Sequence, residues 1–299
     1  MTSRSTESPR AVLALDIGGT KLSAAVVTLD GSIVVSDRVS TPARDPWSAV
    51  ASIVSRTLAA ADGVDVVAVG AGCGGPMTSG GDAVSPLHIP AWRDFPLRSA
   101  LRDLVQRPVV VDNDAKALAL GEGWLGVARG STNFMAVVVG TGVGAGLVID
   151  GRLLNGDDGN AGHIGHVIVE SGGRSCRCGA HGCLEAYLSG VAIEQHTGQP
   201  ARYATAAVIE DAARRFGRAV SSVAALTSIE LVVVGGSVAL GWGAPFFLAA
   251  RREFAERSRL GFTQSIAIEP AGGRSSLLGA AALARSLAHE SIPASRRPE

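Results

Sequence analysis

The sequence has almost no lysine and no excess of charge of either sign. Only Lys21 and Lys116 are lysines among 27 basic residues, and 27 acidic residues balance them, so the net charge is zero. A neutral chain presents no broad electrostatic field to nucleic acid or to an anionic membrane. We therefore expect a small-molecule partner, with neither nucleic acid nor a membrane among the partners.

Long apolar runs are missing as well. No stretch approaches the roughly 20 apolar residues that a membrane-spanning helix needs. Residues 1–10 are polar and lack the apolar centre of a secretory signal peptide, so we expect a disordered lead-in and a cytoplasmic protein. Thiols stay reduced in the cytoplasm, so clustered cysteines indicate metal ligands rather than disulfides.

What the chain does contain is an alternation of strand-like and helix-like segments, which is typical of an α/β fold. One pattern within it occurs twice: residues 13–34 and 137–154 each run strand, loop with Gly and Thr, strand, Asp-Gly turn. Such an internal duplication predicts two similar lobes. The apolar periodicity stops between His163 and Glu185, so something other than a core must hold that segment.

The two duplicated glycine loops are candidate phosphate-binding sites. Glycine lets the backbone approach a ligand closely, and successive N–H groups can hold an anion. A tight turn is the plain alternative. No Gly-Lys-Ser/Thr opens a helix here, as a Walker loop requires, and the strand-like residues after the first loop exclude a Rossmann motif. The candidates are Asp16, Gly18, Gly19, Thr20 and Lys21 in the first loop and Thr141 and Gly142 in the second. A carboxylate at a strand end, as at position 16, can hold Mg²⁺ directly or through water.

The run Asp112-Asn113-Asp114 follows an apolar strand and opens a helix that the spacing predicts over residues 112–124. Capping of that helix is one interpretation, because Asp and Asn are favoured at helix N-termini. The other is substrate chemistry. Asn113 offers a donor and an acceptor to a sugar hydroxyl, and Asp114 can accept a proton from an attacking hydroxyl.

Three cysteines and a histidine form the third candidate site. His166, Cys176, Cys178 and Cys183 lie in a polar, glycine-rich stretch. Three thiolates and one imidazole make a tetrahedral Zn²⁺ set, and four protein ligands leave no open position, so the predicted zinc is structural. A loose set of buried thiols is the alternative. Cys73 lies in an apolar segment and is expected in the core.

Four motifs together resemble the ROK family of sugar kinases and sugar-responsive repressors. The resemblance spans about residues 12–284 and rests on DIGGTK at 16–21, VDNDAKALALGE at 111–122, VVGTGVGAGLVIDG at 138–151, and GHIGHVIVESGGRSCRCGAHGCLEAYLSG at 162–190. It implies an actin-like, ribonuclease H-like ATPase fold of two lobes. We expect one lobe over 11–112 with about 282–299, and the other over 113–281 with a zinc segment at 163–185.

The resemblance also implies roles for single residues. Asp114 is the expected base that deprotonates the sugar hydroxyl, and ATP with Mg²⁺ is the expected donor. The implied sugar ligands are Asn113, His166 and Glu185, with Gly75 in a loop over the sugar and His166 also holding zinc. Gly235 and Gly236 match the glycines on the adenosine side, and the family likeness further implies a homodimer.

Two positions depart from the family pattern. His163 stands where the family usually has a glutamate that holds hydroxyls near the anomeric carbon, so the polarity of the sugar pocket changes and glucose specificity is in doubt. His163 is a candidate sugar ligand, and competition with His166 for zinc is the less favoured interpretation. Lys116 replaces a usual asparagine, with no consequence that the sequence indicates.

The expected function is ATP-dependent phosphorylation of a hexose, glucose or a close relative. A kinase for an N-acetylhexosamine or a cyclitol is the first alternative, since His163 alters the pocket. A sugar-sensing regulator without catalysis is the second, although such relatives carry a DNA-binding helix-turn-helix before the sensor and only about ten residues precede the first expected strand here. Polyphosphate in place of ATP is the third, but no basic track supports it.

Overall fold

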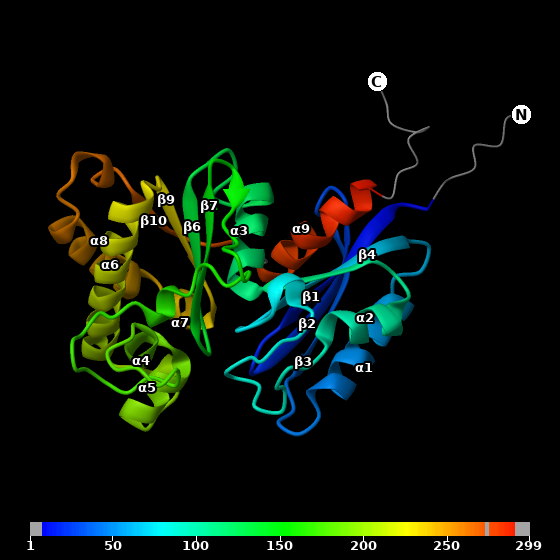
Figure 1. The fold of residues 1–299 in the computed structure, drawn as a ribbon, viewed down its shortest axis with the longest axis horizontal. Helices are drawn as coiled ribbons and strands as arrows, with labels where there is room; N and C mark the ends of the chain where they lie inside the picture. The colour runs from blue at the N-terminus through cyan, green and yellow to red at the C-terminus, as the bar shows by residue number, and fades with distance from the viewer. Residues whose placement is uncertain (1–7, 273–274, 291–299) are drawn as a thin grey trace, which may run out of the picture. The chain divides into compact units, whose positions relative to one another are not determined.

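A computed structural model describes residues 8–272 and 275–290, and the chain within it forms two compact units. One unit comprises the chain up to Asp112 together with the chain from Ser276 on, and the other runs from Asn113 to Ser275 (Figure 1). Of the disordered lead-in expected at residues 1–10, residues 1–7 lie outside the described residues. The expectation is wrong at Arg10, because the first strand already begins there. No helix among the described residues is long and apolar enough to cross a membrane.

The first unit is built on a five-stranded sheet in the order β3-β2-β1-β4-β5. Its strands are β1 (Arg10–Ile17), β2 (Lys21–Thr28), β3 (Ile33–Ser40), β4 (Asp65–Cys73) and β5 (Val109–Asn113). β1 pairs antiparallel with β2 and parallel with β4, and β2 pairs antiparallel with β3. The glycine loop between β1 and β2 is therefore the turn of a hairpin at the end of the central strand.

Helices cover both faces of this sheet (Figure 1). α1 (Pro46–Ala59) and α2 (Leu97–Val105) pack on one face, where Leu13, Ile53 and Leu101 share a core. α9 (Ser275–Glu290) covers the other face, and it comes so close to β4 that a side-chain carbon on Gly70 would lie 1.9 Å from the carbonyl oxygen of Ala280. A glycine is therefore required at this crossing.

The second unit repeats this architecture. Its sheet has the order β8-β7-β6-β9-β10. The strands are β6 (Phe134–Val139), β7 (Val143–Ile149), β8 (Arg152–Leu153), β9 (Leu231–Gly235) and β10 (Ala267–Pro270). β6 pairs antiparallel with β7 and parallel with β9, and β7 pairs antiparallel with β8. The relation of β6 to its neighbours is thus that of β1 to its own, which confirms the α/β class and the duplicated pattern.

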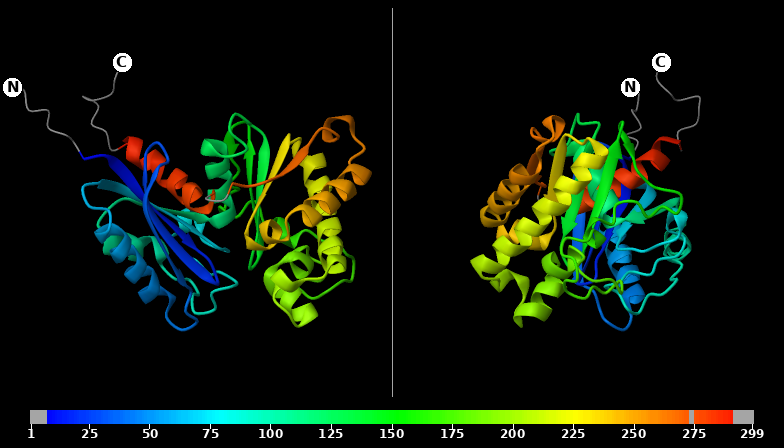
Figure 2. Two further views of the ribbon diagram at one scale, coloured as in Figure 1. Left: turned by 180° about the vertical axis from the view of Figure 1, so that it is seen from behind. Right: turned by 60° about the vertical axis from the view of Figure 1, so that its left-hand side comes forward.

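Alternate residues of β6 face different helices. Met135 and Val137 point into the core formed with α6 (Ala206–Thr227) and α8 (Ala244–Arg257), whereas Phe134 and Ala136 pack with Leu118 of α3 (Asp114–Leu125). Figure 2 shows α3 on one face of the sheet and α6 with α8 on the other. Three short helices complete this unit: α4 (Glu185–Leu188) and α5 (Gly190–Thr197), separated by Ser189, and α7 (Ser237–Trp242), which follows β9 after Gly236.

A buried carboxylate joins α6 to α8. The Glu253 side chain of α8 is only 3% exposed, and it accepts hydrogen bonds from Arg214 and Arg218 of α6 and from Arg257. Burial alone raises the pKa of this carboxyl group, but the bonds from the arginines outweigh that effect and hold the pKa at about 2. The ionised form of Glu253 is thus strongly preferred in the folded protein.

Candidate active site

The expected catalytic pair lies where β5 ends and α3 begins. Asn113 is the N-cap of α3, and its Oδ1 accepts the Ala115 N–H at 2.9 Å. Asp114 is the first helical residue, and its Oδ1 accepts the same N–H at 2.9 Å. The prediction that the helix begins at Asp112 is wrong, because Asp112 still belongs to β5 and the capping role falls on Asn113.

Two glycines of β7 bring this helix start against the second glycine hairpin. A side-chain carbon on Gly144 would lie 3.4 Å from Cβ of Ala115 and 3.8 Å from Oδ1 of Asn113. A side-chain carbon on Gly146 would lie only 2.7 Å from the Ala115 carbonyl oxygen, which is too close for any other residue. Asn113 and Ala115, the two neighbours of Asp114 in the chain, therefore lie beside Gly144, two residues after the hairpin glycine Gly142.

Glu185 closes this arrangement from another part of the chain. It is the first residue of α4, it is buried, and its Oε2 accepts the Val143 N–H at 2.8 Å directly after the hairpin Gly140-Thr141-Gly142. The hairpin is itself tied by a bond from Gly140 N–H to Gly142 O and by a bond from Gly190 N–H to Gly140 O. The pairing of Glu185 with Val143 could not be predicted from a local pattern, because 42 residues separate them.

The expected adenosine-side glycines follow β9 in the same unit. Gly235 ends β9, and Gly236 has a φ of +94°. A side-chain carbon on Gly236 would lie 2.2 Å from the carbonyl oxygen of Val139, the last residue of β6. Gly236 is therefore fixed against the strand that leads into the second hairpin.

Both histidines of the site lie on a segment laid along β7. Gly162, with a φ of +106°, has its carbonyl bonded to the Ala145 N–H, and a side-chain carbon there would lie 1.9 Å from the Ala145 oxygen. The rings of His163 and His166 follow at a centroid distance of 5.9 Å. Burial first, and then the neighbouring His166, lower the pKa of His163, although Glu185 opposes them. His163 is accordingly a neutral ring near pH 7.

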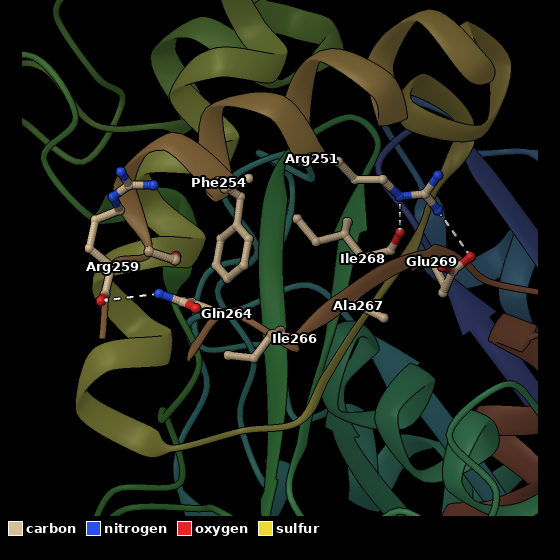
Figure 3. Close-up of a pocket in the computed structure, with 10 residues that line it drawn as sticks. Arg251, Phe254, Arg259, Gln264, Ile266, Ala267, Ile268 and Glu269 are labelled. Atoms are coloured by element: carbon tan, nitrogen blue, oxygen red, sulfur yellow. Dashed lines mark hydrogen bonds and ion pairs between the residues drawn. The ribbon is translucent and has the colours of Figure 1, made fainter. Parts of the chain in front are cut away.

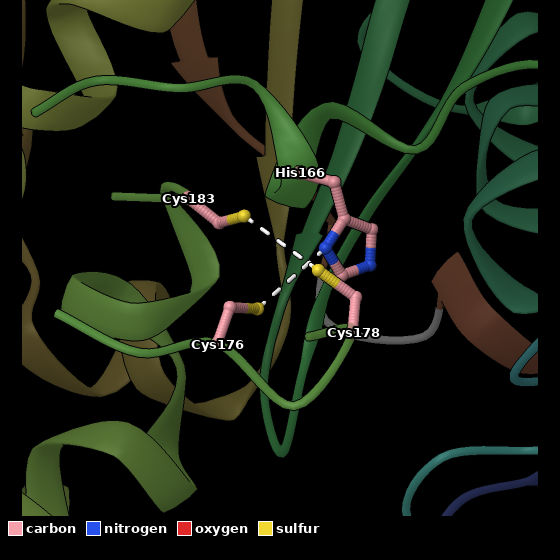
Figure 4. A group of neighbouring side chains, drawn as sticks. All are labelled: His166, Cys176, Cys178 and Cys183. Atoms are coloured by element: carbon pink, nitrogen blue, oxygen red, sulfur yellow. Dashed lines mark hydrogen bonds between the residues drawn. The ribbon is translucent and has the colours of Figure 1, made fainter. Parts of the chain in front are cut away.

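The predicted metal ligands come together (Figure 4). Sγ of Cys176 lies 3.7 Å from Nδ1 of His166, Sγ of Cys178 lies 3.7 Å from Sγ of Cys183, and all four ligand atoms lie within 4.8 Å of one another. Ligand atoms around a tetrahedral Zn²⁺ are roughly 3.6–3.8 Å apart, since Zn–S is about 2.3 Å and Zn–N about 2.1 Å. The donor set and its spacing therefore fit zinc.

Two of the three thiols resist ionisation, whereas the third ionises more readily. Burial raises the pKa of Cys183 to about 12 and raises that of Cys176, whereas the Ala180 N–H lowers that of Cys178. A bound metal would supply the charge that stabilises the thiolates. An aromatic clamp also holds this segment, because the guanidinium carbons of Arg174 and Arg215 lie 4.6 and 4.2 Å from the centre of the Tyr187 ring.

The first hairpin belongs to the other unit and is described there by itself. Asp16, near the end of β1, is paired with Lys21 at 3.8 Å, and burial raises the pKa of Asp16 while Lys21 opposes the rise. Thr41 spans the loop, since its hydroxyl donates to Gly18 O at 2.7 Å and its N–H donates to Thr20 O at 3.1 Å. Thr41 was not predicted, because no local pattern links it to a loop 21 residues earlier.

Gly19 and Gly75, two further predicted site residues of the first unit, both lie in loops. Gly19 passes so close to His88 that a side-chain carbon would lie 2.7 Å from its Cβ. Gly75 follows β4 and forms a cis peptide bond with Pro76, and its carbonyl accepts the Leu87 N–H.

The contacts of Lys116 could not be predicted from the sequence. Its side chain is buried in the first turn of α3, and Nζ donates to Asn155 Oδ1 at 2.9 Å and to Gly159 O at 2.6 Å. Its charge also acts on His163 and lowers the pKa of that ring.

A separate cavity of about 590 Å³ lies between α8 and β10 (Figure 3). Arg251 crosses it, donating from Nε to the Ile268 carbonyl oxygen at 2.8 Å and pairing with Glu269 at 3.0 Å. Phe254 and Ile266 supply its apolar lining. None of the predicted site residues lines this cavity.

Comparison with known proteins places the chain among sugar kinases. The model of the ROK family matches residues 12–287. An N-acetylmannosamine kinase of Yersinia pseudotuberculosis is 33% identical over 293 residues, which cover 91% of this chain and 98% of that protein. The crystal structure of a ROK family glucokinase from Streptomyces griseus, in complex with glucose and AMPPNP, is similar with a TM-score of 0.80, 29% identity, and coverage of 92% of this chain and 99% of that one. A ROK hexokinase from Thermus thermophilus has a TM-score of 0.79, 31% identity, and coverage of 94% and 100%.

Proposed function

This chain belongs to the ROK family, and we propose on that basis that it is an ATP-dependent kinase acting on N-acetylmannosamine. The observation that carries the kinase assignment is the placement of Asn113 and Asp114 beside the second glycine hairpin, with Glu185 bonded to the residue that follows it. Phosphoryl transfer to a sugar needs a carboxylate that accepts a proton, side chains that bind the sugar hydroxyls, and backbone N–H groups that bind the phosphates.

In the proposed reaction, Asn113 and Glu185 orient the sugar hydroxyls, and Asp114 takes the proton of the attacking hydroxyl. That oxygen forms a bond to the γ-phosphorus while the bond from the phosphorus to the β–γ bridging oxygen breaks, so ADP leaves. The predicted residues for the phosphates are the two glycine hairpins, and Asp16 is the residue that would hold Mg²⁺. The metal neutralises charge on the phosphates when bound.

We further assign a structural zinc ion to the Cys₃His set. The imidazole atom that faces the thiols is Nδ1 of His166. Zinc on Nδ1 leaves the proton on Nε2, so the ring becomes a donor of fixed tautomer, suited to a sugar hydroxyl. The metal then serves the site by orienting a ligand of the sugar and takes no part in the transfer.

The choice of sugar rests on His163 and on the relatives. A neutral imidazole offers one donor and one acceptor, which suits the N–H and C=O of an acetamido group, whereas a glutamate at this position offers only acceptors. Curated relatives at 33% identity are N-acetylmannosamine kinases. Glucose is the second candidate, because the glucokinase and the hexokinase resemble the chain at 29% and 31% identity.

An ADP-release assay with MgATP tests the proposal across N-acetylmannosamine, N-acetylglucosamine, mannose and glucose, and mass spectrometry of the products confirms transfer. We expect kcat/KM for N-acetylmannosamine to exceed that for glucose by at least about tenfold, the worth of one well-placed hydrogen bond to a polar group. A preference for glucose would reject the substrate, and turnover of no sugar would reject the kinase. Polyphosphate in place of ATP tests the alternative donor, and light scattering tests the expected homodimer.

A further inference from the structure

We propose that Lys116 is a positioning residue for the sugar, which ties the loop before His163 to the helix that carries Asp114. The proposal rests on the proposed function and adds to it a determinant of sugar affinity outside the direct ligands. It starts from a lysine that is buried to 99%, two residues after the expected base and in the same helical turn.

The buried amine of Lys116 is held by two hydrogen-bond acceptors. A lysine ammonium group is costly to bury unless hydrogen bonds compensate it. Here Nζ donates to Oδ1 of Asn155 and to the carbonyl oxygen of Gly159, at 2.9 and 2.6 Å. Bonds from a charged donor are among the stronger ones in proteins, so this tie is well suited to hold a loop.

The loop that contains both acceptors, residues 155–161, is closed on itself and leads to His163. Its two ends are joined, because the Ala161 N–H donates to the Asn155 carbonyl, and Gly162 then binds along β7. Lys116 therefore holds the closed loop 155–161 at two points, and only Gly162 separates that loop from His163.

The tie through Lys116 is expected to affect how the sugar binds. Asp114 and His163 are on different elements, and their separation decides whether one sugar can reach both. A tie from the turn of Asp114 to the loop of His163 sets that separation before the sugar binds. Removal of the tie should thus weaken sugar binding, whereas the nucleotide, bound by other residues, should be unaffected.

The test compares steady-state kinetics of the full-length wild type and variants, varying N-acetylmannosamine and ATP separately. Lys116→Met keeps the length of the side chain and removes the donors. We expect its KM for the sugar to rise about tenfold or more, with the KM for ATP within about twofold of wild type. Asn155→Ala removes one partner at an exposed position and should raise the sugar KM by a smaller factor, and it decides the matter if Lys116→Met does not fold.

The same substitution in a His163→Ala protein separates a positioning role of Lys116 from a general loss of structure. If Lys116 acts through His163, Lys116→Met should change the sugar KM by less than about twofold in a His163→Ala protein, because coupled residues are not additive. Glu122→Gln is the matched control: it alters a buried charge further along the same helix, bonded to the Val127 N–H, and should lower the melting temperature without changing the sugar KM.

An unchanged sugar KM in folded Lys116→Met, an equal rise in the KM for ATP, or an equal effect in the His163→Ala background each overturns the inference. Those results leave a wild type that phosphorylates sugar, so the proposed function survives them. A wild type that phosphorylates no sugar removes the proposed function itself, before any variant is compared.

Discussion

Glu185 is expected to serve both the stability of the second unit and the binding of the sugar, and two substitutions separate these roles. Its carboxylate accepts a hydrogen bond of 2.8 Å from the Val143 N–H, and both residues are buried. Glu185→Ala leaves that N–H without its acceptor, which costs about 2 kcal/mol. For a unit of this size the loss corresponds to a fall in melting temperature of roughly 4–8 °C.

Glu185→Gln keeps a side-chain oxygen for Val143 but removes the negative charge. We expect it to melt within about 2 °C of wild type, whereas both variants lose sugar kcat/KM by roughly 10–100-fold because a charge-assisted bond to a hydroxyl is lost. Differential scanning fluorimetry and sugar kinetics measure the two effects. Glu194→Ala, an exposed glutamate in the next helix, is the control and should change neither. Equal melting of the Ala and Gln variants, or a sugar kcat/KM like that of wild type, would refute the reasoning.

Purified protein should hold about one zinc per chain, and Cys178→Ser or a strong chelator should lower the melting temperature and the affinity for the sugar while the KM for ATP stays unchanged; full sugar affinity without zinc contradicts the assignment. Glu253 has a folded pKa of about 2, below its usual 4.5, so its contribution of roughly 3 kcal/mol is present above about pH 5 and is lost as the pH falls towards 2. Urea unfolding of wild type and Glu253→Gln should therefore differ at pH 7 and converge in acid, and a constant difference would exclude this origin. Gly162→Ala puts a carbon 1.9 Å from the Ala145 oxygen, so it should lower the free energy of unfolding by at least about 2 kcal/mol and raise the sugar KM. Gly151→Ala is the control, because Gly151 has a φ of +72° but nothing within 4 Å, and it should lower the free energy of unfolding by only about 1 kcal/mol. Equal effects of the two substitutions in melting experiments would show that packing is not the cause.

Several parts of the candidate site could be predicted because they depend on local patterns in the sequence. The duplicated Gly-Thr loops predicted two hairpins, and the two sheets repeat one strand order. The spacing of Cys176, Cys178 and Cys183 predicted that they meet His166, since a short polar segment without a core has few other ways to be held. The strand-to-helix junction at Asn113 was also predicted, although two residues too early.

What the sequence did not indicate depends on contacts between distant segments. The hydrogen bonds from Val143 to Glu185 and from Lys116 to Gly159 join residues about 40 positions apart, and no periodicity encodes such pairs. β3 continues through the polar residues Ser36, Asp37 and Arg38 to Ser40, because β2 provides a partner along its length. Pairing with a neighbouring strand there outweighs the weak strand propensity of polar residues.

The central claim is that Asp114 takes the proton of a sugar hydroxyl, and Asp114→Asn tests it most directly. Asparagine keeps an oxygen for the Ala115 N–H, so the melting temperature and the KM values for sugar and ATP should stay near those of wild type. We predict that kcat for N-acetylmannosamine phosphorylation falls by about 10²–10⁴-fold, the usual contribution of a general base. A variant that folds normally and retains the wild-type kcat would contradict the account.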